Sequence, residues 1–385
     1  MSHGHGPPPE QKIRERGEGV IDGRDTTPAV GRRGEPGGWR RAVEGARVRG
    51  FKPRFEDGRW SFLYRADSTR YAAAPSVDGE VAAAARRMRG DPHVPVPVKG
   101  PVIRPNVWTW EVPLYFWFGG IATGAAFAAL GCQAAGDERS ARVARMVAIG
   151  AVGPGGPLLI LDLGRPERFL HMFRILKTRS PMSMGAWCLM AFSNTGAAAV
   201  AADLLRWRRC AKGLTVATAA LGTYLGSYTG VLLASTAVPV WNRSRRFLPP
   251  IFICTASASG AAVTRLALAA TGTPSEHPTR SGLAALESVA MTGELVLSAI
   301  NEHRLGIAGR ALEEGRPGRL LAAARALTAT GLVLRAVGRR GGATVDHLPS
   351  VMFLAAALAY RFGWVGAGRT SALDHEAVAT LARRP

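Results

Sequence analysis

Cysteine is scarce in this sequence, which has four copies among 385 residues and no CxxC pair. An iron–sulfur cluster requires several grouped thiolates, so these cysteines are interpreted as small packing residues. Histidine is sparse inside the long apolar runs, because its eight copies fall in the tails or near the ends of those runs. A transmembrane haem needs axial ligands within helices. We therefore expect no haem, no iron–sulfur cluster and no other metal site in this chain.

Acidic residues are also in short supply, with 28 Asp and Glu against 49 Lys and Arg and a formal net charge of +21 at pH 7. Such an excess is typical of proteins that bind nucleic acid, because basic side chains neutralise phosphates. Here the basic residues gather in a tail and in short loops between apolar runs, where they suit anionic lipid headgroups. The charge pattern therefore favours membrane lipid as the partner and excludes nucleic acid.

Long apolar runs are missing from residues 1–105, which are rich in Gly, Pro and Arg. This composition buries little apolar surface and favours disordered backbone. We expect a basic, largely disordered N-terminal extension without an independent domain.

From residue 112 onward the pattern changes to apolar stretches of about twenty residues, the length at which a helix crosses the hydrocarbon core. The expected spans are 112–135, 141–162, 182–205, 212–240, 247–271, 282–301, 318–337 and 347–366. The sequence therefore predicts an all-α membrane protein, a polytopic bundle of about eight transmembrane helices. Its membrane domain covers residues 106–366, and a short tail follows at 367–385.

An even number of spans places both termini on one side of the membrane. Lys and Arg are nearly balanced between the loops of the two sides, so the loops alone do not decide the orientation. Basic residues that flank the first and last spans favour cytoplasmic termini in the cell membrane.

Three stretches within residues 108–241 occur in a distinctive order: WTWEVPLYFWFGGIATGAAF, LLILDLGRPERFLHMFRILKTRSPMSMGAW and YLGSYTGVLLASTAVPVW. The most specific element is DLGRP at 162–166, with SPMSMGAW beginning fourteen residues after Pro166. In these elements the chain resembles the NrfD/polysulfide reductase membrane-anchor family, and the likeness extends over roughly residues 106–366.

The resemblance implies a membrane subunit of a respiratory oxidoreductase that carries no redox cofactor of its own. Members bind menaquinone or ubiquinone as substrate and exchange electrons with a ferredoxin-like subunit that holds [4Fe–4S] clusters. That partner is usually bound to a molybdopterin-containing catalytic subunit. We expect the same arrangement here, with proton translocation as a further expectation; the chain by itself is not a complete enzyme.

Glu111 and Tyr115 stand four residues apart at the start of the first span, which places them on one helical face near the interface. A Tyr hydroxyl can bond a quinone carbonyl while a nearby carboxylate passes protons. The alternative is an interfacial belt in which Tyr115 anchors the helix and Glu111 reaches headgroup water. In the fourth span, Tyr228 occupies the place where the resemblance puts a quinone-contacting tyrosine, and Tyr224 lies one turn earlier. A structural hydrogen bond to a neighbouring helix is the alternative for these phenols.

Asp162 and Arg165 lie at the mouth of the second span, where a carboxylate and a guanidinium can pair and hold the loop that follows. By resemblance this loop lies on the side where the partner docks. Arg168 and His171 follow on an expected interfacial helix, where His171 can carry protons near neutral pH or remain a solvated surface histidine.

Five ionisable residues fall deeper in the later spans, where a lone charge is costly and usually faces a partner or water. They are Arg265, Glu287, Glu294, Arg335 and Arg361. Glu287 and Glu294 are seven apart and so share one stripe, and Arg265 is the expected counter-charge. The set predicts either a transmembrane proton path or structural ion pairs between helices.

Two other classes of function remain open at this point. A secondary transporter is one, because spans interrupted by Gly and Pro, such as AIGAVGPGGPLLI, can form broken helices around a substrate. A purely structural membrane anchor, whose partner binds quinone elsewhere, is the other.

Overall fold

The computed structural model describes residues 103, 108–162, 173–337, 343–374, 377, 378 and 381. The chain divides into two compact units, Met1–Asp57 and Gly58–Pro385, and all of the described residues belong to the second. The expected disordered extension, residues 1–105, therefore lies outside the described residues except for residue 103.

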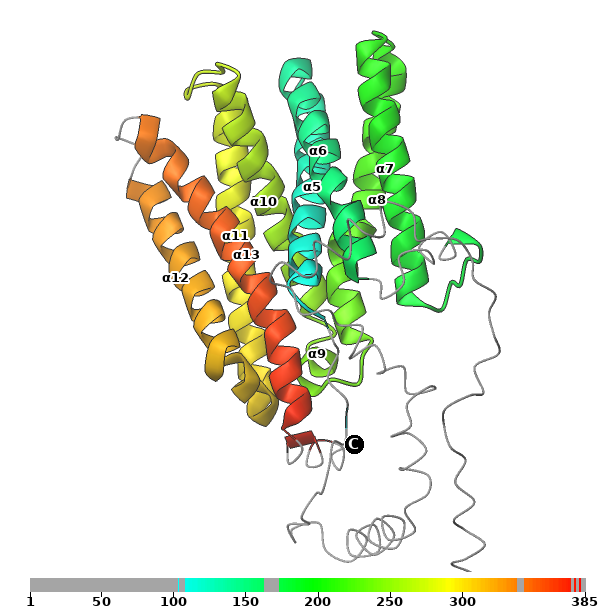
Figure 1. Ribbon diagram of the computed structural model, residues 1–385. Coiled ribbons are helices and arrows are strands. Elements are labelled where there is room, and N and C mark those ends of the chain that lie inside the picture. Colours follow the sequence, from blue (N-terminus) through cyan, green and yellow to red (C-terminus); the bar gives the residue numbers. More distant parts are fainter. Residues whose placement is uncertain are drawn as a thin grey trace, which may run out of the picture. The chain divides into compact units, whose positions relative to one another are not determined.

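Eight long helices make up the described part of the chain, together with one short α-helix and one 3₁₀ helix (Figure 1). The long helices are α5 (Glu111–Ala134), α6 (Glu138–Asp162), α7 (Pro181–Leu204), α8 (Arg208–Ala234), α10 (Leu248–Ala270), α11 (Pro278–Leu305), α12 (Gly315–Val337) and α13 (Ala343–Leu373). The short elements are α9 (Pro239–Arg243) and η3 (Gly306–Leu312). No strand is present among the described residues.

Seven of the described helices are long and apolar enough to cross a membrane. The eighth long helix, α7, has spanning length, but Ser193, Asn194 and Thr195 in its middle lower its hydropathy. The prediction of an all-α polytopic membrane bundle is confirmed.

The expected fourth span, 212–240, divides into two helices. α8 ends at Ala234, where the hydroxyls of Ser235 and Thr236 donate back to carbonyls of the last turn. Pro239 lacks an amide hydrogen and fits the first position of a new helix, so it opens α9 instead of continuing α8. The last helix, α13, continues to Leu373, past the expected end of its span.

α5 and α10 are the central pair of the bundle. α5 packs against α6, α8, α10 and α13, while α10 also contacts α8, α11 and α13. Their closest crossing is at Gly124 and Gly260, where a Cβ on either residue would overlap the backbone of the other helix. Small residues permit such close approach between membrane helices, which lack a hydrophobic drive toward one another.

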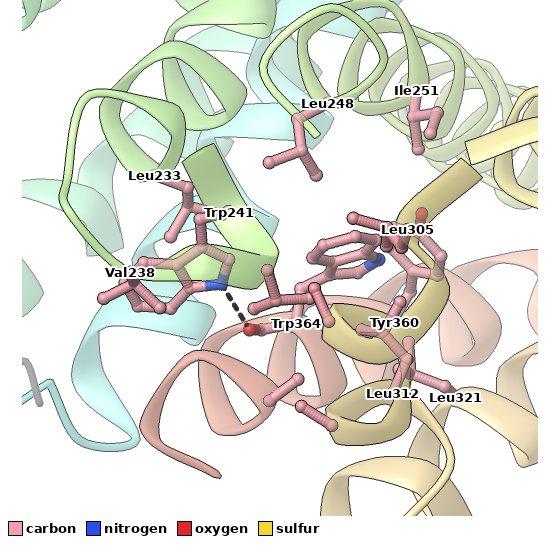
Figure 2. Packing of buried hydrophobic residues seen from close by; sticks show 14 of the residues in the cluster. Leu233, Val238, Trp241, Leu248, Ile251, Leu305, Leu312, Leu321, Tyr360 and Trp364 are labelled. Carbon is pink, nitrogen blue, oxygen red and sulfur yellow. Dashed lines mark hydrogen bonds between the residues drawn. The ribbon is translucent and has the colours of Figure 1, made fainter. Parts of the chain in front are cut away.

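We name the two ends of the bundle by their positions in Figure 1. The lower end carries α9, η3 and the C-terminal part of α13, and the upper end carries the turns at 135–137, 205–207 and 271–277. At the lower end a cluster of aromatic and aliphatic side chains joins α9 to α13 (Figure 2). The indole nitrogen of Trp241 donates to the Trp364 carbonyl at 2.8 Å, and Trp108 stacks on Trp241 with ring centroids 5.4 Å apart.

A buried ion pair ties the first four long helices together nearer the upper end. Arg145 of α6 donates to Asp203 of α7 at 2.5 Å, to the Thr215 hydroxyl of α8 at 2.7 Å and to Gln133 of α5 at 2.9 Å. Because each bond reaches a different helix, one guanidinium sets the spacing of the α5–α8 group.

The upper turn before α6 is held by Asp137. Its carboxylate accepts the backbone N–H of Ser140 at 3.0 Å and the hydroxyl of Thr279 at 2.6 Å, and His277 Nδ1 lies 3.9 Å away. Burial raises the pKa of Asp137, but these hydrogen bonds and the nearby His277 outweigh it and leave the pKa below its usual value. The carboxylate thus joins the start of α6 to the start of α11.

Candidate quinone site and buried polar chains

Three tyrosines converge where α5, α6, α7 and α8 meet in the lower half of the bundle. The rings of Tyr224 and Tyr228 on α8 lie 6.1 Å apart with an interplanar angle of 33°. Tyr228 is 5% exposed and packs on Gly185 of α7, where any Cβ would overlap its ring. Tyr115 of α5 lies against Gly155 of α6, on the side of the bundle where Tyr228 lies. Three residues of the expected quinone set are therefore brought together.

The phenol hydroxyls of this group make no hydrogen bond with any described residue. Tyr228 is buried, whereas Tyr115 and Tyr224 are half-buried, so these hydroxyls can bond a headgroup that enters beside them. Cys188 of α7 also lies beside α8, where its thiol donates to the Leu221 carbonyl at 3.5 Å. An apolar surface with a few convergent donors is the chemistry that a quinone headgroup requires.

Glu111 occupies the first turn of α5 and accepts a hydrogen bond from the hydroxyl of Thr109. It lies one turn from Tyr115, as expected, and no hydrogen bond joins the two side chains. Asp162 is the last residue of α6 and lies at the lower end. The other expected docking residues, Arg165, Arg168 and His171, lie outside the described residues.

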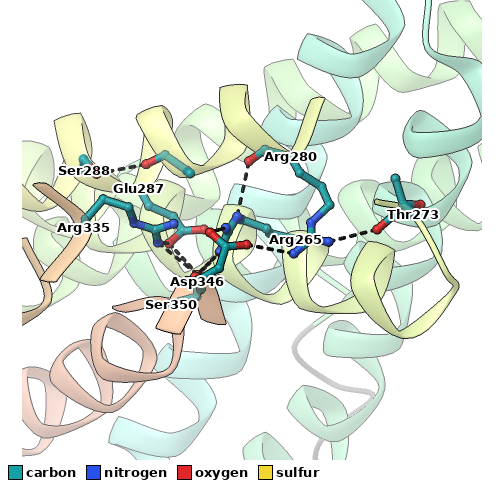
Figure 3. Close-up of polar contacts among 9 residues, drawn as sticks. Arg265, Thr273, Arg280, Glu287, Ser288, Arg335, Asp346 and Ser350 are labelled. Carbon is teal, nitrogen blue, oxygen red and sulfur yellow. Dashed lines mark hydrogen bonds and ion pairs between the residues drawn. The ribbon is translucent and has the colours of Figure 1, made fainter. Parts of the chain in front are cut away.

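A second group of polar side chains joins α10, α11, α12 and α13 toward the upper end of the bundle, and Figure 3 shows its contacts from close by. We call it the upper polar cluster, and its members are Arg265, Arg280, Glu287, Arg335, Asp346 and Ser350. All four helices contribute to it, so the later spans are tied together by charges instead of by apolar packing alone.

The ion pairs of the upper polar cluster differ from the expected ones. We expected Arg265 to be the counter-charge of Glu287 and Glu294, but it pairs with Asp346, which also accepts from Arg280 at 3.0 Å. Glu287 pairs with Arg335 of α12 instead. The reason is geometric: α13 brings Asp346 beside the ends of α10 and α11, a juxtaposition that spacing along one helix cannot indicate.

Ser350 is the hub of this cluster. Its hydroxyl accepts hydrogen bonds from Arg265 at 3.0 Å and Arg335 at 3.1 Å, and donates to Glu287 at 2.8 Å. A serine can serve both roles because it has one donor hydrogen and two acceptor lone pairs. The fully buried Glu287 carboxylate is thereby connected to Asp346 through Ser350 and Arg265.

Glu294 belongs to a different set of hydrogen bonds, nearer the lower end. Its Oε1 accepts from Ser298 at 2.8 Å, and Ser298 lies 2.9 Å from the hydroxyl of Tyr360. One turn further along α11, Asn301 donates to Ser244 at 3.0 Å. Sequence reasoning missed Ser298, Tyr360, Asn301 and Ser244. The seven-residue interval that links Glu287 to Glu294 could have identified Asn301.

Arg361 lies fully buried between α5, α10 and α13. One nitrogen donates to the Thr255 hydroxyl at 3.3 Å, and the guanidinium lies 4.7 Å from the ring centroid of Phe252. Gly120 of α5 leaves room for it, because a Cβ there would lie 2.6 Å from Nη2. No carboxylate among the described residues pairs with Arg361, and the ring face of Phe252 supplies part of the compensation for burying this charge.

The fold and these buried polar groups define a polytopic helical membrane protein, with the tyrosine group in its first four long helices and a charged interior in the last four. Residues 102–373 match the family described as polysulphide reductase, NrfD. The chain belongs to the NrfD family, as its sequence motifs predicted. No curated protein matches it.

Proposed function

We propose that this chain is the quinone-binding membrane subunit of a respiratory oxidoreductase complex. It exchanges electrons between quinone, either menaquinone or ubiquinone, and the [4Fe–4S] clusters of a ferredoxin-like partner. That partner in turn binds a molybdopterin-containing catalytic subunit. The observation that carries the proposal is the convergence of Tyr115, Tyr224 and Tyr228, whose hydroxyls bond none of the described residues, inside the segment that matches the NrfD family.

Each tyrosine has a role that follows from its position. Tyr228 is the most deeply placed of the α8 phenols, and its hydroxyl donates to one quinone carbonyl. Tyr115 approaches from α5 and donates to the same headgroup, while Tyr224 forms part of the wall. Quinone reduction takes up two protons as well as two electrons, and Glu111, one turn from Tyr115 and half-buried at the helix start, is the carboxylate placed to pass protons from the lower interface.

The lower end is the docking face in this proposal. Asp162 at the end of α6, with Arg165, Arg168 and His171 after it in sequence, contacts the iron–sulfur partner, so the terminal cluster lies on the same side as the tyrosine group. Both chain termini lie on the cytoplasmic side of the cell membrane.

Proton translocation is the second part of the proposal. Arg265, Glu287, Glu294, Arg335 and Arg361 line a path through α10–α13, in which the carboxylates carry protons and the arginines hold the carboxylates and hydroxyls in place. Support comes from the burial of both glutamates and from their hydrogen-bonded hydroxyls, Ser350 and Ser298.

The experiment uses the purified complex and measures the rate at which quinol reduces the iron–sulfur clusters. Tyr115→Phe and Tyr228→Phe each remove one donor, so we expect the rate to fall by about tenfold or more, the effect of roughly 1.4 kcal/mol in transition-state binding. Thr292→Val removes an exposed hydroxyl from α11, away from the tyrosine group, and should leave the rate unchanged. Unchanged rates in both site variants would remove the assignment and favour a purely structural anchor.

A further inference from the structure

The buried face of α11 carries polar side chains at a regular seven-residue interval. Arg280, Glu287, Glu294 and Asn301 are all buried and lie on one stripe of the helix. From the first to the last of them the helix rises about 31 Å at about 1.5 Å per residue. That distance matches a hydrocarbon core of roughly 30 Å, so the stripe extends from one interface to the other.

The upper part of the stripe is connected to a partly exposed carboxylate. Asp346 has a side chain that is 30% exposed, and it pairs with Arg265 and Arg280. Arg265 donates to Ser350, which donates to Glu287. A continuous set of hydrogen-bonding groups therefore runs from the upper surface to a fully buried carboxylate.

The lower part also has a partly exposed carboxylate and a buried one, but no hydrogen bond among the described residues joins them. Glu302, at the end of α11, has a side chain that is 26% exposed and pairs with Arg325 at 2.5 Å. Eight residues of helix, about 12 Å along the axis, separate Glu302 from Glu294, which accepts from Ser298 and, through it, is linked to Tyr360. A partly exposed carboxylate again precedes a buried one.

The two parts do not meet. Between Glu287 and Glu294, the buried residues of α11 are Ala290 and Met291. Both pack with residues of α10 and α13, and we call this group the apolar layer: Ala258, Ala290, Met291, Phe353 and Ala356. Seven residues of helix separate the two carboxylates by about 10 Å along the axis, which is far beyond hydrogen-bond reach.

We infer that the apolar layer is a dry barrier that divides the proton path into an upper half ending at Glu287 and a lower half ending at Glu294. Each half exchanges protons with its own interface, and the layer prevents passive proton flow across the membrane by excluding water. This inference rests on the proton path of the proposed function. It adds Asp346 and Glu302 as the groups that receive protons from water, and Met291 and Phe353 as the largest residues of the barrier.

The test measures passive proton influx into liposomes that contain the full chain and a pH-sensitive dye, with potassium and valinomycin to dissipate the charge. Quinol and electron acceptors are absent. The wild-type chain should be nearly impermeable. Met291→Asn places a polar side chain in the barrier, so we expect proton influx to rise by about tenfold or more. Met291→Leu keeps the layer apolar and should match the wild type.

A second substitution tests whether the leak follows the stripe. Adding Glu294→Gln to Met291→Asn removes the lower carboxylate, and influx should return to the wild-type rate. No increase with Met291→Asn would overturn the barrier, and so would an increase that persists after Glu294→Gln, because the protons would then cross elsewhere. If Met291→Asn does not fold, Phe353→Asn replaces it, and the same changes in proton influx are expected.

The barrier and the quinone site fail independently. Quinol-dependent cluster reduction in the complex depends on the tyrosine group of α5 and α8, whereas passive influx requires neither quinol nor a partner. If Met291→Asn does not raise proton influx but Tyr228→Phe still slows cluster reduction, the barrier is refuted and the quinone site is supported. If Met291→Asn raises proton influx but Tyr228→Phe leaves cluster reduction unchanged, the quinone site is refuted and the barrier is supported.

Discussion

The ion pair between Arg145 and Asp203 offers a direct test of what holds the first four long helices together. The two side chains are 3% and 6% exposed, and Arg145 also binds Thr215 and Gln133. Replacing Arg145 leaves Asp203 buried without its partner, which typically costs about 3–5 kcal/mol, whereas replacing Asp203 leaves Arg145 with Glu138 at 3.6 Å. We therefore expect Arg145→Met to lower the free energy of unfolding by about that amount, and Asp203→Leu to lower it by less because Glu138 remains beside Arg145.

The double variant should behave differently from either single one. With both charges replaced by apolar side chains, neither desolvation nor an orphaned charge remains, so the loss should be smaller than in either single variant. Reversible unfolding in mixed micelles with increasing SDS, followed by tryptophan fluorescence, measures all four free energies of a double-mutant cycle. Additive losses in the double variant would show that Arg145 and Asp203 do not stabilise the fold as a pair, and would refute this reasoning.

Two further predictions concern the upper turn and the central crossing. The pKa of Asp137 is lowered in the folded protein, so its stabilising effect is present at neutral pH and is lost as the pH falls below about 4. The melting temperatures of the wild type and of Asp137→Asn should therefore differ at pH 7 and converge at low pH. A difference that stays constant with pH would contradict this prediction. Gly260→Ala should destabilise the protein by about 1–3 kcal/mol or more, because the new Cβ would overlap Gly124. Gly131→Ala is the control: its Cβ would lie in open space on α5, so this variant should be neutral or slightly stabilising. Equal stabilities of the two variants in SDS unfolding would argue against a tight α5–α10 crossing.

Local patterns in the sequence predicted most of the helices. Apolar runs of spanning length depend only on neighbouring residues, so the starts of α5, α7 and α10 were expected to within one residue. The division of the fourth span was missed because hydropathy continues through Val238 and Val240. Its cause is the backbone chemistry of Pro239 together with the hydroxyls that end α8.

The sequence predicted which residues belong to the buried polar sites, but only part of the ion pairs and hydrogen bonds that they form. Helical spacing placed Glu287 and Glu294 on one stripe, and both are buried there. The counter-charge was wrong because Arg265 and Asp346 are 81 residues apart in sequence and meet only when α13 packs beside α10. Ser298 and Tyr360 were missed for the same reason, since neither hydroxyl is distinctive until the two helices bring them together.

The sequence by itself determined the membrane class, the succession of spanning helices and the family, because hydropathy, helical period and short motifs are properties of contiguous residues. Only the tertiary structure decided which charges pair, that three tyrosines from two helices share one place, and that an apolar layer separates the two buried glutamates. Those features arise from contacts between helices far apart in the chain, and such contacts are set by packing that no local pattern contains.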